Sequence, residues 1–193
     1  MNIPNKITLS RIILIPVMVV FFYLKGVLAY NFLITAIVFS LCAFTDFIDG
    51  YFARKLNQVT NMGKFLDPIA DKVLIAVALF LLTATALTAN AAIPSPYLEI
   101  GACLIIAREL IIGGFRQVAA ANGIVIAADK SGKIKTFVQD ISIILMFLTL
   151  QFFDIEGLKY ASYVLFGLAV VLTLYSGVMY IVKNPHVFAD KKE

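Results

Sequence analysis

Four aspartates stand at the ends of two long apolar runs of this chain. Asp46 and Asp49 close the run LITAIVFSLCAFTDFID, and Asp67 and Asp71 open the run FLDPIADKVLIAVALFLL. Carboxylates at membrane depth are costly and rare, so they are a functional-site hypothesis by default. Residues three or four apart share one face of a helix. Each pair is therefore expected to project two carboxylates from one helix face.

The two pairs are expected to meet, because the polar segment 53–66 is short enough to make the two helices antiparallel neighbours. Four converging carboxylates repel one another, and some become protonated, unless a cation neutralises them. Hard oxygen ligands suit Mg²⁺ or Mn²⁺, and no His or Cys nearby suggests a softer metal. We therefore expect a divalent metal site formed by the four aspartates.

Two simpler interpretations of these acids stay open. The aspartates could form ion pairs with basic neighbours, which are Arg54, Lys55, Lys64 and Lys72. Asp67, which precedes Pro68, could also be an ordinary helix N-cap.

The composition indicates an all-α integral membrane protein. The chain is 61% hydrophobic and 15% charged over 193 residues, whereas soluble domains are about 45–50% apolar and about 25% charged. Six apolar segments approach the length needed to span a bilayer. We expect transmembrane helices at 9–28, 30–52, 66–88, 96–119, 134–153 and 159–182, an amphipathic N-terminal segment, and one domain over 1–193. No small-residue cleavage pattern follows the first run, so we expect that run to remain in the mature chain.

The basic residues predict the orientation in the membrane. Only Lys25 and Lys159 fall on one side of the predicted bilayer, and Arg108 lies within the fourth segment; the other thirteen of the sixteen Lys and Arg residues fall on the opposite side. By the positive-inside rule, both termini and all four aspartates are expected to face the cytoplasm. The basic excess indicates contact with anionic headgroups, and nucleic acid is not an expected partner.

The residues between the aspartates carry a resemblance to a known family. Gly50, Ala53 and Gly63 lack bulk, which allows a flat or charged group to approach the backbone. The pattern Asp46-x2-Asp49-Gly50-x2-Ala53-Arg54-x8-Gly63-x3-Asp67-x3-Asp71 resembles the signature of the CDP-alcohol phosphotransferases, with every fixed position present. The six-helix outline is similar as well.

The resemblance implies the transfer of a phosphatidyl or similar group from a CDP-linked donor to an alcohol, with release of CMP, by a homodimer. The four aspartates would hold two metals over the donor diphosphate, and Asp71 would also be the general base. The resemblance also implies which residues contact the nucleotide or its diphosphate, namely Gly50, Ala53, Arg54, Gly63 and Lys64. Asn5 and Thr8 are further nucleotide candidates, although a helix cap explains them equally well.

Basic residues later in the chain bear on the acceptor. A cationic pocket suits an alcohol that itself carries a phosphate. Its candidate residues are Arg108, Arg116, Lys133, Lys135 and Thr136. Two alternatives stay open: Arg108 could pair with Glu109, and Lys133 and Lys135 could be positive-inside anchors.

The stretches ARELIIGGFR and GKIKT resemble the bacterial phosphatidylglycerophosphate synthases of this family, as does the opening NIPN-x2-T-x2-R. That resemblance implies CDP-diacylglycerol as donor, glycerol 3-phosphate as acceptor, and an active site on the cytoplasmic face of a bacterial cell membrane. The alternatives are an enzyme with inositol phosphate or phosphatidylglycerol as acceptor and, from another class, a small metal or ion transporter.

Overall fold

The described residues of this protein form a bundle of six α-helices. A computed structural model describes residues 3–55, 61–86, 91–122, 124 and 130–188; the side chains of 3–7, 46–55, 61–65, 67, 121, 130, 131, 186 and 188 lie outside that description. The helices are α1 (Ile3–Tyr23), α2 (Asn31–Lys55), α3 (Asn61–Thr83), α4 (Tyr97–Ala121), α5 (Lys130–Gln151) and α6 (Glu156–Val182), followed by the short 3-10 helix η1 (Pro185–Phe188). No strand occurs within the described ranges, which confirms the all-α prediction.

Helices α1 and α3 begin furthest from their predicted starts at residues 9 and 66. The first helix begins at Ile3, so the expected amphipathic N-terminal segment is the opening of α1. The third helix begins at Asn61, and Asp67 and Pro68 lie inside it. The alternative of Asp67 as a helix N-cap was therefore wrong. It rested on proline favouring the first turn of a helix, but proline also occurs inside membrane helices whose neighbours satisfy the freed backbone groups.

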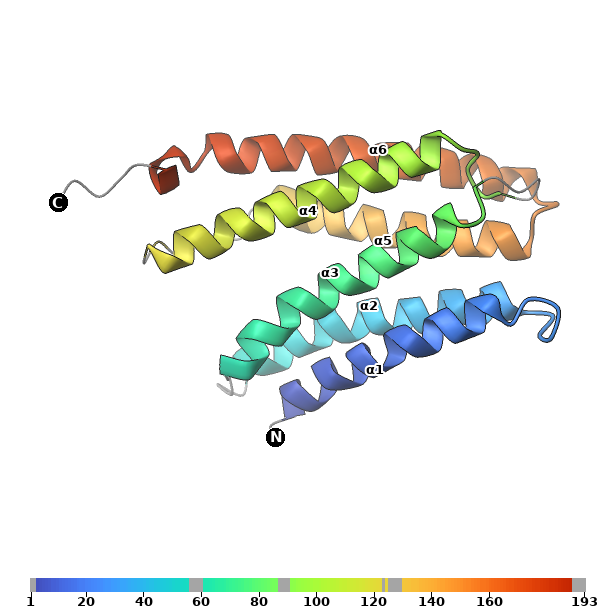
Figure 1. The fold of residues 1–193 in the computed structure, drawn as a ribbon, viewed down its shortest axis with the longest axis horizontal. Helices are drawn as coiled ribbons and strands as arrows, with labels where there is room; N and C mark the ends of the chain where they lie inside the picture. Colours follow the sequence, from blue (N-terminus) through green and yellow to red (C-terminus); the bar gives the residue numbers. More distant parts are fainter. Residues whose placement is uncertain (1–2, 56–60, 87–90, 123, 125–129, 189–193) are drawn as a thin grey trace.

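The helices alternate in direction, and the start of α1 and the short helix η1 lie at the same end of the bundle (Figure 1). That end, called the terminal end below, also contains the carboxyl ends of α2, α4 and α6 and the amino ends of α3 and α5. At the opposite end, α1 and α2 are joined by a turn in which Gly26 has a φ of +90°. An L side chain is strained in that conformation, so glycine is the residue that suits it.

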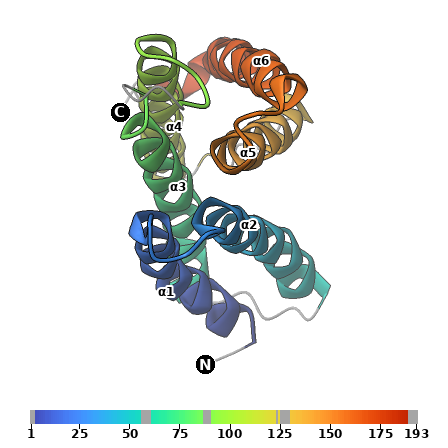
Figure 2. The same ribbon diagram turned by 90° about the vertical axis from the view of Figure 1, so that its right-hand side faces the viewer.

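Two groups of helices share one core. Helices α1, α2 and α3 pack together, and α6 packs against both α4 and α5. Helix α3 joins the groups because it also contacts α4 and α5, and α2 contacts α5 (Figure 2). Aromatic rings fill the junction, where the ring centroids of Phe39 and Phe147 lie 6.3 Å apart. Between helices in a membrane, close packing contacts of this kind stabilise the association, because lipid tails are as apolar as the side chains they replace.

Within the described ranges, two helices are long and apolar enough to cross a membrane by length and composition, namely Gly132–Gln151 in α5 and the whole of α6. Shorter apolar stretches occur at Thr8–Tyr23 and Asn31–Thr45. The apolar stretch of α2 ends where Asp46 begins the charged part of that helix. The two aspartates of α2 thus follow directly after its apolar stretch.

Candidate active site

The aspartates occupy two neighbouring helices near the terminal end. Asp46 and Asp49 lie in α2, and Asp67 and Asp71 lie in α3, which packs against α2. We call this region the carboxylate half of the site. Asp71 is half-buried, whereas the side chains of the other three lie outside the description. No cluster of three or more His, Cys, Asp or Glu occurs among the side chains that are described, and those exclude three of the four aspartates.

The residues predicted to bind the nucleotide lie on the same two helices, α2 and α3, apart from those of the N-terminal helix. Gly50, Ala53 and Arg54 lie in the last turns of α2, and Gly63 and Lys64 lie in the first turn of α3. Their surroundings, like those of the Asn5 side chain, fall outside the described residues, so their roles stay predictions.

Helix α1 contributes buried polar groups to this region. Thr8 and Arg11 are 1% and 0% exposed, and they share a face because they are three residues apart. Helix α1 packs against α2 and α3. A buried guanidinium needs compensating partners. Arg11 takes part in at least one interaction with other groups, whereas its Nε has no hydrogen bond to a described protein group. From the sequence, Arg11 contributed to the predicted orientation and to the opening NIPN-x2-T-x2-R, but it was not a candidate site residue. Its spacing from Thr8 was the signal that could have identified it.

Helices α4, α5 and α6 form a second region, which we call the cationic half. Glu109 Oε1 accepts a hydrogen bond from Arg108 Nη1 at 3.0 Å and another from Lys135 Nζ. Arg108 Nη2 donates to Ser176 Oγ at 2.9 Å. One carboxylate is thus shared by two cations, and the network joins all three helices. The open alternative of an Arg108–Glu109 pair is present, but that pair belongs to a larger cluster.

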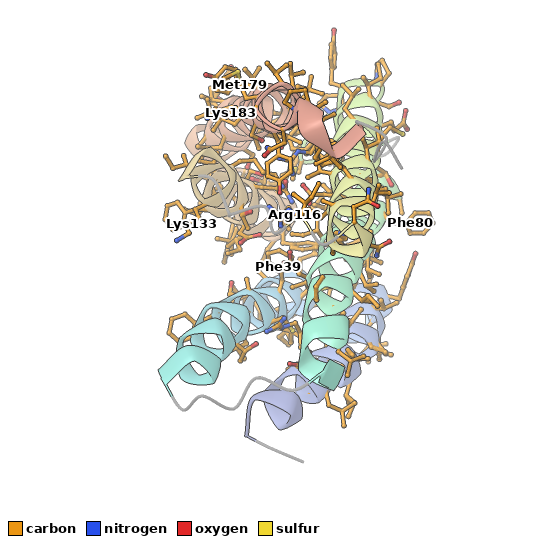
Figure 3. The ribbon with its side chains drawn as sticks, turned by 90° about the vertical axis from the view of Figure 1, so that its left-hand side faces the viewer. Phe39, Phe80, Arg116, Lys133, Met179 and Lys183 are labelled. Carbon is orange, nitrogen blue, oxygen red and sulfur yellow. The ribbon has the colours of Figure 1, made fainter. Side chains whose placement is uncertain are left out.

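Arg116 lies nearer the terminal end of α4. Its Nε donates to the Tyr180 hydroxyl at 2.9 Å, and its guanidinium carbon lies 5.0 Å from the centroid of that ring. The bond to Tyr180 uses one of the five N–H donors of the guanidinium, and a neutral partner leaves the charge uncompensated. Figure 3 shows Arg116 on the inner side of α4, between the two groups of helices. This geometry suits the binding of an anion.

The remaining acceptor candidates are placed differently. Lys133 is exposed and lies on the outer side of α5, away from Arg116 (Figure 3). The Thr136 hydroxyl donates to the carbonyl of Gly132 at 3.1 Å, within the first turns of α5. The fold therefore buries Lys135 and half-buries Arg108, whereas Arg116 and Lys133 are both exposed. Arg116 differs from Lys133 because it lies on the inner side of its helix, where Tyr180 binds it.

Sequence reasoning missed the polar residues of α6. Thr173, Ser176 and Tyr180 are buried and recur at intervals of three and four, so they form one polar stripe in a very apolar helix. That periodicity was visible in the sequence.

The cationic half also contains buried polar atoms without a hydrogen bond to any described protein group, namely Arg108 Nε, Gln139 Oε1 and Thr173 Oγ1. Leaving such an atom unsatisfied costs about 1–3 kcal/mol. Native structures usually provide a partner in the form of protein, water or ligand. This part of the bundle is therefore suited to receive polar molecules.

Comparison with known proteins gives a consistent result. The sequence matches the family model described as CDP-alcohol phosphatidyltransferase over residues 1–175. It is 40% identical over 193 residues to the CDP-diacylglycerol–glycerol-3-phosphate 3-phosphatidyltransferase of Bacillus subtilis, with 95% of each chain covered.

Proteins with the same name in Salmonella choleraesuis and Rickettsia felis are 38% and 35% identical, and 93% of each chain is covered. The matches thus extend over nearly the whole sequence, including both halves of the site. They favour an enzyme over the alternative of a transporter.

Proposed function

This chain belongs to the CDP-alcohol phosphatidyltransferase family, and from that premise we propose that it transfers the phosphatidyl group of CDP-diacylglycerol to glycerol 3-phosphate. The products are phosphatidylglycerophosphate and CMP. The observation that carries this proposal is the similarity, over 93–95% of the chain, to relatives named for this reaction. The protein is a membrane-bound transferase of phospholipid biosynthesis.

The cationic half supports the choice of acceptor. Arg116 is bound by the neutral Tyr180, and Glu109 is shared between Arg108 and Lys135, so positive charge exceeds negative charge in this cluster. A phosphate monoester dianion matches that excess, whereas choline, ethanolamine or free inositol does not. In the proposed complex, Arg108, Arg116 and Lys135 bind the phosphate of glycerol 3-phosphate. Thr136 and Lys133 are expected to contribute less to the binding of that phosphate.

The carboxylate half supplies oxygen ligands of the kind that Mg²⁺ and Mn²⁺ prefer. Asp46, Asp49, Asp67 and Asp71 would hold two such ions. Two divalent ions would stabilise negative charge on the donor diphosphate during transfer. Gly50, Ala53 and Gly63 would make room for the cytidine nucleotide, with Arg54 and Lys64 near its phosphates and Asn5 and Thr8 as further contacts.

The reaction itself is a displacement at phosphorus. The C1 hydroxyl of glycerol 3-phosphate attacks the phosphorus that carries the diacylglycerol, and Asp71 accepts the hydroxyl proton. A new P–O bond forms as the bond to the bridging oxygen of the diphosphate breaks, and CMP leaves with that oxygen and its electron pair. Positioning and charge neutralisation are the main requirements of such transfers.

We further propose one domain over 1–193, six membrane-spanning helices and an active site at the terminal end that faces the cytoplasm of a bacterial cell. The distribution of Lys and Arg supports this orientation.

We also propose that the protein is a homodimer. Phe80, which is 69% exposed, projects away from the bundle (Figure 3). Light scattering of the protein in detergent, corrected for bound detergent, measures the oligomeric state.

The test of the reaction uses purified protein in detergent micelles with CDP-diacylglycerol, Mg²⁺ and one acceptor at a time. We expect CMP release with glycerol 3-phosphate and none after EDTA treatment until Mg²⁺ or Mn²⁺ is restored. Release with inositol phosphate or phosphatidylglycerol, but not with glycerol 3-phosphate, would assign another acceptor. Absence of CMP release with every acceptor would contradict the proposed enzyme, and release in EDTA would contradict the metal requirement.

A further inference from the structure

One basic residue connects the two halves of the site. Lys72 follows Asp71 in α3, is half-buried, and extends to α4, where its ammonium lies against the backbone of Gly113. A Cβ atom added at Gly113 would lie 3.1 Å from Cε of Lys72 and would clash with Nζ. The next residue, Gly114, has nothing within 4 Å of the same added atom. Only the first of these adjacent glycines is thus required to leave room for Lys72.

The position of Gly113 places the Lys72 ammonium in the cationic half. Gly113 is four residues after Glu109 and three before Arg116, so the three share one face of α4 on successive turns. Glu109 binds Arg108 and Lys135, and Arg116 binds Tyr180. Lys72 therefore approaches the same helix face as these groups, but it comes from the helix that carries the proposed base.

The charges around Lys72 favour an anion. Within the described part of the chain, the carboxylate of Glu109 forms ion pairs with Arg108 and Lys135, and Lys72 forms none. A half-buried ammonium near other cations is unfavourable unless an opposite charge is close. A phosphate dianion supplies that charge with oxygen acceptors for the ammonium.

We propose that Lys72 binds the phosphate of the acceptor alcohol, and that Gly113 provides the space in which it does so. The inference rests on the proposed function. Because Lys72 and Asp71 are adjacent in α3, one helical turn would bind the acceptor phosphate and also receive the proton from the attacking hydroxyl. The separation of these two groups then selects an acceptor by the distance between its phosphate and its reactive hydroxyl.

The primary test replaces the ammonium without removing the length of the side chain. In Lys72→Met, the KM for glycerol 3-phosphate is expected to rise about tenfold or more, because a charge-assisted hydrogen bond is lost. The KM for CDP-diacylglycerol should stay within about twofold, and Lys72→Arg should recover part of the loss. An unchanged KM for glycerol 3-phosphate, or a rise confined to CDP-diacylglycerol, would overturn the assignment.

The matched glycine variants test the position of the ammonium. Gly113→Ala is expected to raise the KM for glycerol 3-phosphate in the same direction as Lys72→Met, because the added methyl group displaces Nζ. Gly114→Ala should resemble the wild type. The Gly113→Ala effect should largely disappear in the Lys72→Met background, since contacting residues are not additive. Equal effects of the two glycine variants, or full additivity with Lys72→Met, would count against the proposal.

A stability readout separates binding from a structural role. Saturating glycerol 3-phosphate should raise the unfolding temperature of the wild type, and less so that of Lys72→Met. An equal rise in both proteins would overturn the proposal. If Lys72→Met does not fold, Lys72→Gln is read by the same criteria. Failure of the wild type to release CMP with glycerol 3-phosphate would contradict the proposed function, whereas wild-type turnover with unaffected Lys72 variants contradicts only the role of Lys72.

Discussion

The two halves of the candidate site are built in different ways. The carboxylate half takes its aspartates and glycines from one stretch, 46–71, at helical spacings on two consecutive helices. The cationic half joins side chains that are distant in sequence: Glu109 and Lys135 are separated by 26 residues, and Arg108 and Ser176 by 68. The aspartates of the first therefore form a motif that is continuous in sequence, whereas the second combines residues from three helices that are distant in sequence.

This difference assigns separate roles to the two halves. A local motif can bind the components that are the same for every acceptor, namely the donor nucleotide and the metals. The assembled half can determine which alcohol is used, because small changes on any of its helices alter it. Variants of the two halves should therefore fail in different ways.

The largest effect is expected at the base. Asp71→Asn should lower kcat by about 100- to 10,000-fold, because the variant cannot accept the hydroxyl proton. CMP release measures this loss, and circular dichroism at 222 nm checks that the helices remain folded. Asp154→Asn, in the exposed turn after α5, is the control and should retain full activity. Wild-type turnover by Asp71→Asn would remove Asp71 as the base.

A smaller effect, confined to the acceptor, is expected at Arg116. Arg116→Ala should raise the KM for glycerol 3-phosphate by roughly 10- to 100-fold, because a charged donor to phosphate is lost. Tyr180→Phe removes only the hydroxyl that orients the guanidinium and should raise the same KM a few-fold. If the KM for CDP-diacylglycerol rises instead, the proposed division between the two halves fails.

The next effect is expected on the stability of the folded protein, through the ion pairs of the cationic half. Glu109→Gln leaves the buried Lys135 ammonium and Arg108 without their shared carboxylate. The variant should lose about 2 kcal/mol, less than for a fully buried pair because Glu109 is partly exposed. Thermal unfolding followed by circular dichroism measures the loss. Glu156→Gln, at the exposed start of α6, is the control, and equal stability of the two variants would show that the network does not hold α4, α5 and α6 together.

The smallest effect is expected at Lys133. This residue lies outside the cationic half, so Lys133→Ala should change the KM for glycerol 3-phosphate by about twofold, through screened long-range attraction. The change should diminish as the salt concentration is raised from about 0.05 to about 0.5 M, because salt screens the attraction between surface charges. An effect as large as that of Arg116→Ala would place Lys133 in direct contact with the acceptor.

Several features were predictable because they depend on residues close in sequence. The helical content, the approximate positions of six helices and the grouping of the aspartates follow from hydrophobic segments and from spacings of three and four. Membership of the family followed from the fixed positions between 46 and 71. Helix ends were less predictable, since α3 begins at Asn61 and continues through Pro68.

The sequence by itself determined that the protein is helical, apolar and equipped with two acidic helix faces, because helical periodicity and hydropathy are local properties. Only the tertiary structure decided which cations act together. It buried Arg11, joined Lys135 to Glu109, bound Arg116 to Tyr180 and left Lys133 outside. It also brought Lys72 onto Gly113, 41 residues away. Such pairings depend on which helix faces meet, and packing of the whole chain sets those faces.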